Sequence, residues 1–143
     1  MKKYFYIILI LLLSLIGFNF FITNKANTNI YNKELYYKEL KPAQQQWVND
    51  KGIGIYLFKY KQSKLGTNKY LVYSRKKLEY NFQKSKVVEK DGLLSVYIDN
   101  EDALNDGEAR DNLFLYIESN KTVNTLKLYL NGKETNFTEI YQE

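Results

Sequence analysis

The stretch that decides the fold is KVVEKDGLLSVYID, residues 86–99. Two runs with alternating apolar positions, Lys86–Lys90 and Leu93–Asp99, flank the dipeptide Asp91-Gly92. A period of two is typical of a strand with one face against a core, and Asp-Gly favours a tight hairpin turn whose central residues have positive φ. The stretch therefore predicts a β-hairpin.

Similar runs continue on both sides of this hairpin, with no helical pattern between them. The last two flank a second turn dipeptide, Asn131-Gly132. These further candidate strands are Ile53–Tyr60, Lys69–Ser74, Leu78–Phe82, Asn112–Glu118, Val123–Leu130 and Glu134–Tyr141. Because parallel strands need long crossovers, which are usually helical, the pattern predicts a mainly β fold: an antiparallel β-meander forming a small sandwich or partly open barrel.

The predicted core follows from strand parity, since each strand buries about every second residue. Its members are Ile55, Leu57, Leu94, Val96, Ile98, Leu113, Leu115, Ile117, Leu126, Leu128 and Leu130.

The chain before the strands has a polar stalk and a short helical region. In Tyr31–Leu40, three apolar residues fall on one helical face, which predicts a helix. Pro42 suits the first position of a second short helix, and Gly52 suits its end. The predicted division is 1–22 anchor or signal segment, 23–52 stalk and short helical region, and 53–143 β-domain.

An apolar segment follows Lys2 and Lys3 at the amino terminus. Residues 4–22 contain 19 residues without a formal charge, enough for a helix of about 28 Å, close to the thickness of a bilayer core. We expect a transmembrane helix with its amino terminus in the cytoplasm, because the lysines precede it. The expected location is the cell membrane, single-pass, with the carboxy-terminal domain extracytoplasmic, or secreted if the segment is cleaved as a signal peptide.

Composition removes several classes of chemistry. The 143 residues include no Cys and no His, which excludes disulfides, thiol nucleophiles, Ser-His-Asp triads and haem ligation by these residues. No cofactor is expected. An enzyme would need a carboxylate pair, as in glycoside hydrolysis, and the acidic residues gather in one loop instead. We therefore expect a protein that is not an enzyme; the alternative is a small carboxylate-dependent hydrolase acting on cell-wall material.

Charge is unevenly distributed along the exported part. Residues 51–90 carry 11 basic and 2 acidic side chains, whereas residues 91–143 carry 4 basic and 11 acidic ones. One interpretation is a basic face for a polyanion or protein partner; the other is that lysines protect sheet edges and maintain solubility. The candidates for such a face are Arg75, Lys76, Lys77, Lys84 and Lys86. A nucleic acid is not expected for an exported domain.

Two other sets of side chains are candidate sites. Tyrosines at alternating strand positions can stack on sugar rings or on a peptide, or can simply pair across strands. The aromatic-face candidates are Tyr56, Tyr60, Tyr73 and Tyr97, and Phe58, Tyr116 and Tyr129 share the pattern. An irregular calcium site would draw its carboxylates from Asp99, Glu101, Asp102 and Asp106, although a plain solvated loop between strands is the preferred interpretation.

Residues 40–98 resemble the PrcB C-terminal type of small bacterial extracytoplasmic β-domain. The resemblance rests on Leu40–Val48, Gly52–Tyr56, Lys69–Ser74 and Val87–Val96, in the order of a Pro-led helix, two strands and a hairpin. The family's Gly-Gly-Tyr-like turn is replaced here by Arg75–Tyr80, so no functional residue is carried over. The resemblance implies an accessory role at the cell surface.

The sequence thus predicts a membrane-anchored extracytoplasmic, non-catalytic binding or accessory module of a bacterial cell surface. Its expected partners are the lipid bilayer, through residues 4–22, and a protein or an anionic wall polymer, through the β-domain.

Overall fold

The computed structural model describes residues 30–63, 66–77, 82–101 and 111–143. Within these ranges the chain is mainly β, as predicted, with a 3₁₀ turn η1 (Tyr37–Glu39) and one short helix α2 (Pro42–Asn49). The strands are β1 (Ile30–Leu35), β2 (Gly54–Lys59), β3 (Asn68–Arg75), β4 (Phe82–Lys90), β5 (Leu93–Glu101), β6 (Asn112–Ser119), β7 (Thr125–Leu130), β8 (Lys133–Thr135) and β9 (Glu139–Gln142).

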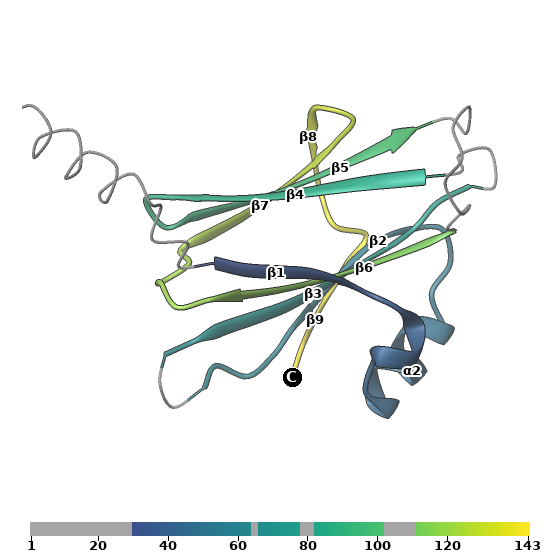
Figure 1. The fold of residues 1–143 in the computed structure, drawn as a ribbon, viewed down its shortest axis with the longest axis horizontal. Coiled ribbons are helices and arrows are strands. Elements are labelled where there is room, and N and C mark those ends of the chain that lie inside the picture. The colour runs from purple at the N-terminus through teal and green to yellow at the C-terminus, as the bar shows by residue number, and fades with distance from the viewer. Residues whose placement is uncertain (1–29, 64–65, 78–81, 102–110) are drawn as a thin grey trace, which may run out of the picture.

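The strands form two sheets that face each other (Figure 1). Sheet A has the order β1-β6-β3-β2-β9, and sheet B has the order β4-β5-β7-β8. The described strands do not close into a barrel, so the sandwich is the correct one of the two predicted forms. The helix α2 lies on the side of sheet A that faces away from sheet B (Figure 1).

The predicted purely antiparallel meander is wrong, because both sheets are mixed. β5 pairs with β7 in parallel, and β2 pairs with β9 in parallel. Parallel neighbours need a crossover connection. For the pair β5 and β7 this connection is β6, a strand of the opposite sheet that lies between them along the chain. A strand in the facing sheet thus replaces the crossover helix on which the prediction was based.

Both predicted turn dipeptides form hairpins. Asp91 and Gly92 have φ of 52° and 81° between β4 and β5, and Asn131 and Gly132 have φ of 50° and 76° between β7 and β8. Positive φ at both central residues is the type I′ requirement. The run Glu134–Tyr141, predicted as one strand, is instead divided between β8 in sheet B and β9 in sheet A.

The helix predicted over Tyr31–Leu40 is also wrong. Ile30–Leu35 is β1, which pairs with β6 over six residues, and η1 follows. Pairing with β6 satisfies the backbone of β1 along its whole length and overrides the local helical pattern. The second predicted helix is confirmed as α2, which begins at Pro42. Of the run Leu78–Phe82, only Phe82 lies among the described residues, at the start of β4.

The core between the sheets is the predicted one. Nine of the eleven predicted residues are buried in one cluster, and Leu126 and Leu130 pack against it. The structure adds Tyr70 and Val72 from β3.

A second core, absent from the prediction, lies between sheet A and α2. Here the opposite parity of the central strands is buried as well, because α2 covers it. The cluster consists of Leu40, Val48, Tyr56, Phe58, Leu71, Tyr73 and Phe114, with Leu35, Trp47 and Tyr60 packed against it. The central strands of sheet A, β2, β3 and β6, are therefore buried on both faces, and the molecule has three layers.

The expected anchor, residues 4–22, and the expected stalk, residues 23–29, lie outside the described residues. Among the residues that the structure describes, no helix has both the length and the apolar character needed to cross a bilayer.

Candidate functional site

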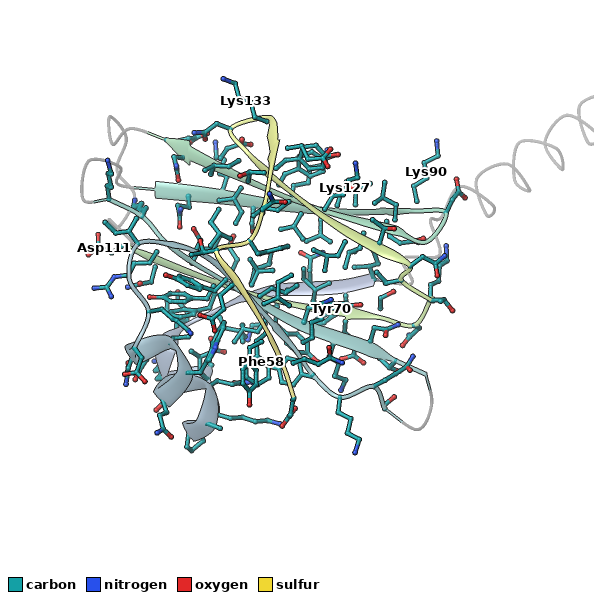
Figure 2. The ribbon with its side chains drawn as sticks, turned by 180° about the vertical axis from the view of Figure 1, so that it is seen from behind. Phe58, Tyr70, Lys90, Asp111, Lys127 and Lys133 are labelled. Carbon is teal, nitrogen blue, oxygen red and sulfur yellow. The ribbon has the colours of Figure 1, made fainter. Side chains whose placement is uncertain are left out.

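The outer face of sheet B, the face directed away from sheet A, is not covered by any described element (Figure 1). In contrast to sheet A, the strands of sheet B alternate between a buried and a more exposed parity. Figure 2 shows Lys90 and Lys127 projecting from sheet B, on the opposite side of the molecule from Phe58. The outer face consists of Lys84, Lys86, Val88, Lys90, Ser95, Tyr97, Asp99, Lys127, Tyr129 and Glu134.

A row of four side chains crosses this face from edge to edge. Lys86 pairs in register with Tyr97, Tyr97 with Tyr129, and Tyr129 with Glu134. The two rings stack with their centroids 4.7 Å apart and their planes 13° from parallel. We call Lys86, Tyr97, Tyr129 and Glu134 the tyrosine row. Its two half-buried rings form a stacked aromatic pair between a cation and an anion.

The lysines around this row differ in their partners. Lys84 forms an ion pair with Glu101 at 2.7 Å, and Lys127 forms one with Glu134 at 2.9 Å. The hydrogen bond from Lys127 to Glu134, together with their charge attraction, raises the pKa of Lys127. Lys86 and Lys90 form no ion pair within the described part of the chain, and both are exposed. Two cations of this face are therefore available to an anionic ligand.

The five predicted basic residues do not form one patch. Lys84 and Lys86 lie on the outer face of sheet B, whereas Arg75 ends β3 in sheet A and donates a hydrogen bond to the carbonyl of Lys51 at 2.7 Å. Lys77 is exposed just beyond β3, and Lys76 is buried, with 7% of its surface exposed.

The four predicted aromatic residues are likewise separated. Tyr56 and Tyr73 are buried in the second core and stack on each other at 5.7 Å, so they do not form part of a surface. Tyr60 contacts the same core and is hydrogen-bonded to Gln44; burial, with a smaller effect of Glu143, raises the pKa of Tyr60 to about 12. Only Tyr97 lies on the open face. Tyr129, its neighbour on the parallel strand β7, completes the stacked pair.

The acidic candidates give no metal centre in the described residues. Asp99 is exposed on the outer face, Glu101 is bound to Lys84, and Asp102 and Asp106 lie outside the described residues. Within 30–63, 66–77, 82–101 and 111–143, no three carboxylates come together as a cation would require.

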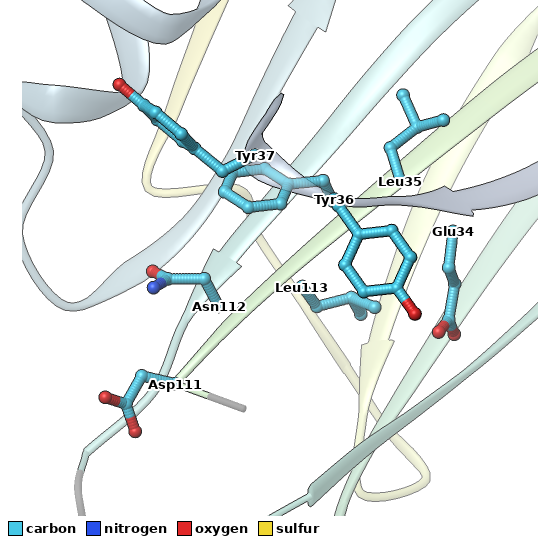
Figure 3. Close-up of a pocket in the computed structure, with 8 residues that line it drawn as sticks. Glu34, Leu35, Tyr36, Tyr37, Asp111, Asn112 and Leu113 are labelled. Atoms are coloured by element: carbon cyan, nitrogen blue, oxygen red, sulfur yellow. The ribbon is translucent and has the colours of Figure 1, made fainter. Parts of the chain in front are cut away.

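The chain also forms a pocket of about 240 Å³ where β1 and η1 meet the start of β6. Figure 3 shows the two carboxylates that line it, Glu34 and Asp111, at opposite ends with Leu113 between them. Glu34 accepts a hydrogen bond of 2.6 Å from the Ser85 hydroxyl on β4. Two carboxylates therefore line one cavity at this place in the described chain.

Comparison of the chain with known protein families, with curated proteins and with solved structures finds no match. The resemblance to the PrcB C-terminal type of domain therefore stays a prediction.

Proposed function

We propose that this protein is a membrane-anchored, extracytoplasmic, non-catalytic binding module of a bacterial cell surface, and that the outer face of sheet B binds an anionic wall polymer. The observation that carries the proposal is the tyrosine row: two stacked rings on a sheet face that no described element covers, beside Lys86 and Lys90, two cations without an ion pair among the described residues.

The chemistry of the row suits a polymer of sugars and acidic groups. Aromatic rings give apolar contact area to a sugar ring, and tyrosine hydroxyls add hydrogen bonds. The neighbouring ammonium groups attract the acidic groups, and this attraction weakens as salt is added. A shallow face also suits a long polymer, which does not need to enter a cavity.

The location rests on the amino terminus. Two lysines followed by 19 uncharged residues favour export with the amino terminus inside, which would place the β-domain beside the wall.

Retention on purified cell walls tests the proposal. The full-length protein in detergent should bind walls, and Y97A/Y129A and K86Q/K90Q should each lower its affinity about tenfold, equivalent to ~1.4 kcal/mol. The matched control is K59Q/K61Q, which removes two lysines near the end of β2 in sheet A and should leave retention unchanged. Equal retention of all variants would remove the outer face from the proposal.

The alternative is a carboxylate-dependent hydrolase of wall material, and the pocket of Figure 3 is where it would act. Such an enzyme uses one carboxyl group as an acid and the other as a base or nucleophile. It predicts release of soluble wall fragments by the wild type and loss of release in both E34Q and D111N. No release by the wild type would exclude this alternative.

A further inference from the structure

A second pocket lies where η1 and the end of α2 meet sheet A, and it adjoins the pocket of Figure 3 because both are lined by Tyr37, Asn112 and Phe114. Its volume is about 240 Å³. Three of its lining side chains are buried: Val48, Tyr73 and Phe114. The other four carry polar groups and are exposed or half-buried: Tyr37, Asn49, Arg75 and Asn112. Polar atoms make up most of the accessible lining, so a ligand in this pocket meets polar groups.

Two tyrosine hydroxyls orient the amides of this pocket. The hydroxyl of Tyr37 donates to Oδ1 of Asn49 at 2.9 Å, and the hydroxyl of Tyr73 donates to Oδ1 of Asn112 at 2.8 Å. A side-chain amide accepts through its oxygen and donates through its NH₂ group. Because a hydroxyl already engages each oxygen, the two amides offer a ligand mainly their N–H donors.

Arg75 adds a cation to the same pocket. It lies opposite Asn112 in the β3–β6 pair, and its Nη1 donates to the carbonyl of Lys51 at 2.7 Å, so the guanidinium group reaches the end of α2 that carries Asn49. Burial raises the pKa of Tyr73, and the positive charge of Arg75 opposes this shift, as expected for a guanidinium group close to that hydroxyl. Within the described part of the chain Arg75 forms no ion pair. Its charge is therefore available to a ligand.

We propose that this pocket binds the free carboxylate at the C-terminal end of a peptide. The planar fork of arginine matches a carboxylate, and such charge-assisted bonds are stronger than neutral ones. The amides of Asn49 and Asn112 would donate to the same group, and the exposed ring of Tyr37 would contact the last side chain. Size favours a peptide end over a larger acidic sugar: a cavity of about 150 Å³ holds benzene, so one of about 240 Å³ holds roughly nine or ten non-hydrogen atoms, as in acetylated alanine. The site is separate from the outer face of sheet B and does not depend on the function proposed for that face.

The test is an NMR titration of the isotope-labelled full-length protein in detergent micelles with N-acetylalanine, which imitates the end of a peptide. The side-chain N–H signals of Asn49, Arg75 and Asn112 should shift and saturate at millimolar concentrations. N-acetylalaninamide, which has nearly the same shape without the charge, should bind roughly tenfold more weakly. Glucuronate represents an acidic sugar, and tighter binding of glucuronate than of N-acetylalanine would overturn the assignment to a peptide end.

Two variants and two controls complete the design. R75Q removes the cation, and N49D replaces the amide NH₂ with a second oxygen while keeping one that accepts from Tyr37, so each should weaken N-acetylalanine binding roughly tenfold. The controls are K77Q, which removes an exposed cation just beyond β3, and N32D, which makes the same Asn-to-Asp change on β1; both should bind as the wild type does. Far-UV circular dichroism establishes that each variant is folded. If the wild type shows no saturating shifts at millimolar concentrations, or if either R75Q or N49D binds as tightly as the wild type, the proposal is overturned.

Discussion

Gly92 shows how much one residue contributes to the hairpin that defines the fold. It has a φ of 81°, and a Cβ atom added to it would lie 2.8 Å from Nδ2 of Asn124, while its carbonyl accepts from the Asn124 backbone N–H at 2.9 Å. G92A adds to the backbone strain a contact that the Asn124 side chain must move to relieve, so it should lower the free energy of unfolding by about 1–3 kcal/mol in urea denaturation.

The control for this prediction is G132A in the other hairpin. Gly132 has a similar φ of 76°, but nothing lies within 4 Å of the added Cβ. G132A should therefore show the backbone strain alone and cost less than G92A. Equal losses would mean that the contact with Asn124 contributes nothing.

A second prediction at the residue scale concerns Lys76 and the dependence of the free energy of unfolding on pH. Its pKa in the folded protein is lower than the ordinary 10.5, so between the two values the unfolded chain binds more protons and stability rises with pH. K76M removes this penalty and should be more stable than the wild type by about 1–3 kcal/mol at pH 7, the cost of an unsatisfied buried group. The difference between K76M and the wild type should shrink as pH rises towards 10.5; urea denaturation across this range measures it, and a constant difference would contradict the assignment.

At the scale of elements, α2 is held by aromatic contacts to sheet A. The ring centroid of Trp47 on α2 lies 5.3 Å from that of Phe58 and 6.4 Å from that of Tyr56. Just after the helix, Lys51 Nζ forms an ion pair of 2.8 Å with Glu139 Oε1 on β9. Because α2 covers the second core, it should unfold together with the sheets. Trp47 is the sole tryptophan, so its fluorescence should change at the same urea concentration as far-UV circular dichroism; an earlier fluorescence transition would show that α2 detaches first.

The strands and hairpins show which parts of the fold could be predicted from the sequence. Period-two patterns and turn dipeptides are local, so the strands, the hairpins at Asp91-Gly92 and Asn131-Gly132, and the first core were predictable. The second core also has a local signal: GIYLFK in β2 and NLFLYIES in β6 are nearly continuous apolar runs, which are typical of strands buried on both faces. The parallel pairings have no local signal, because they depend on which sheet each strand joins.

At the scale of the whole molecule, the candidate site depends on this non-local topology. Tyr97 and Tyr129 are far apart in sequence and become neighbours because β7 pairs in parallel with β5. The charge pattern predicted one basic face made of Arg75, Lys76, Lys77, Lys84 and Lys86. In the structure the first three lie at or just beyond the end of β3 in sheet A, whereas Lys84 and Lys86 lie on β4 in sheet B. One signal in the sequence indicates that Lys76 is buried: it has the same strand parity as Ser74, which is buried. The prediction placed Lys76 on the surface because its side chain is charged.

Site-specific photo-crosslinking in intact cells tests the binding face most directly. A benzoylphenylalanine at position 97 or 129 replaces one aromatic ring with another on the outer face of sheet B, and the same group in place of the exposed Tyr141 on β9 is the control on sheet A. The proposed function predicts crosslinks to wall polymer from positions 97 and 129 and none from position 141. Crosslinks to wall polymer from position 141 alone, or crosslinks from positions 97 and 129 to proteins only, would contradict it.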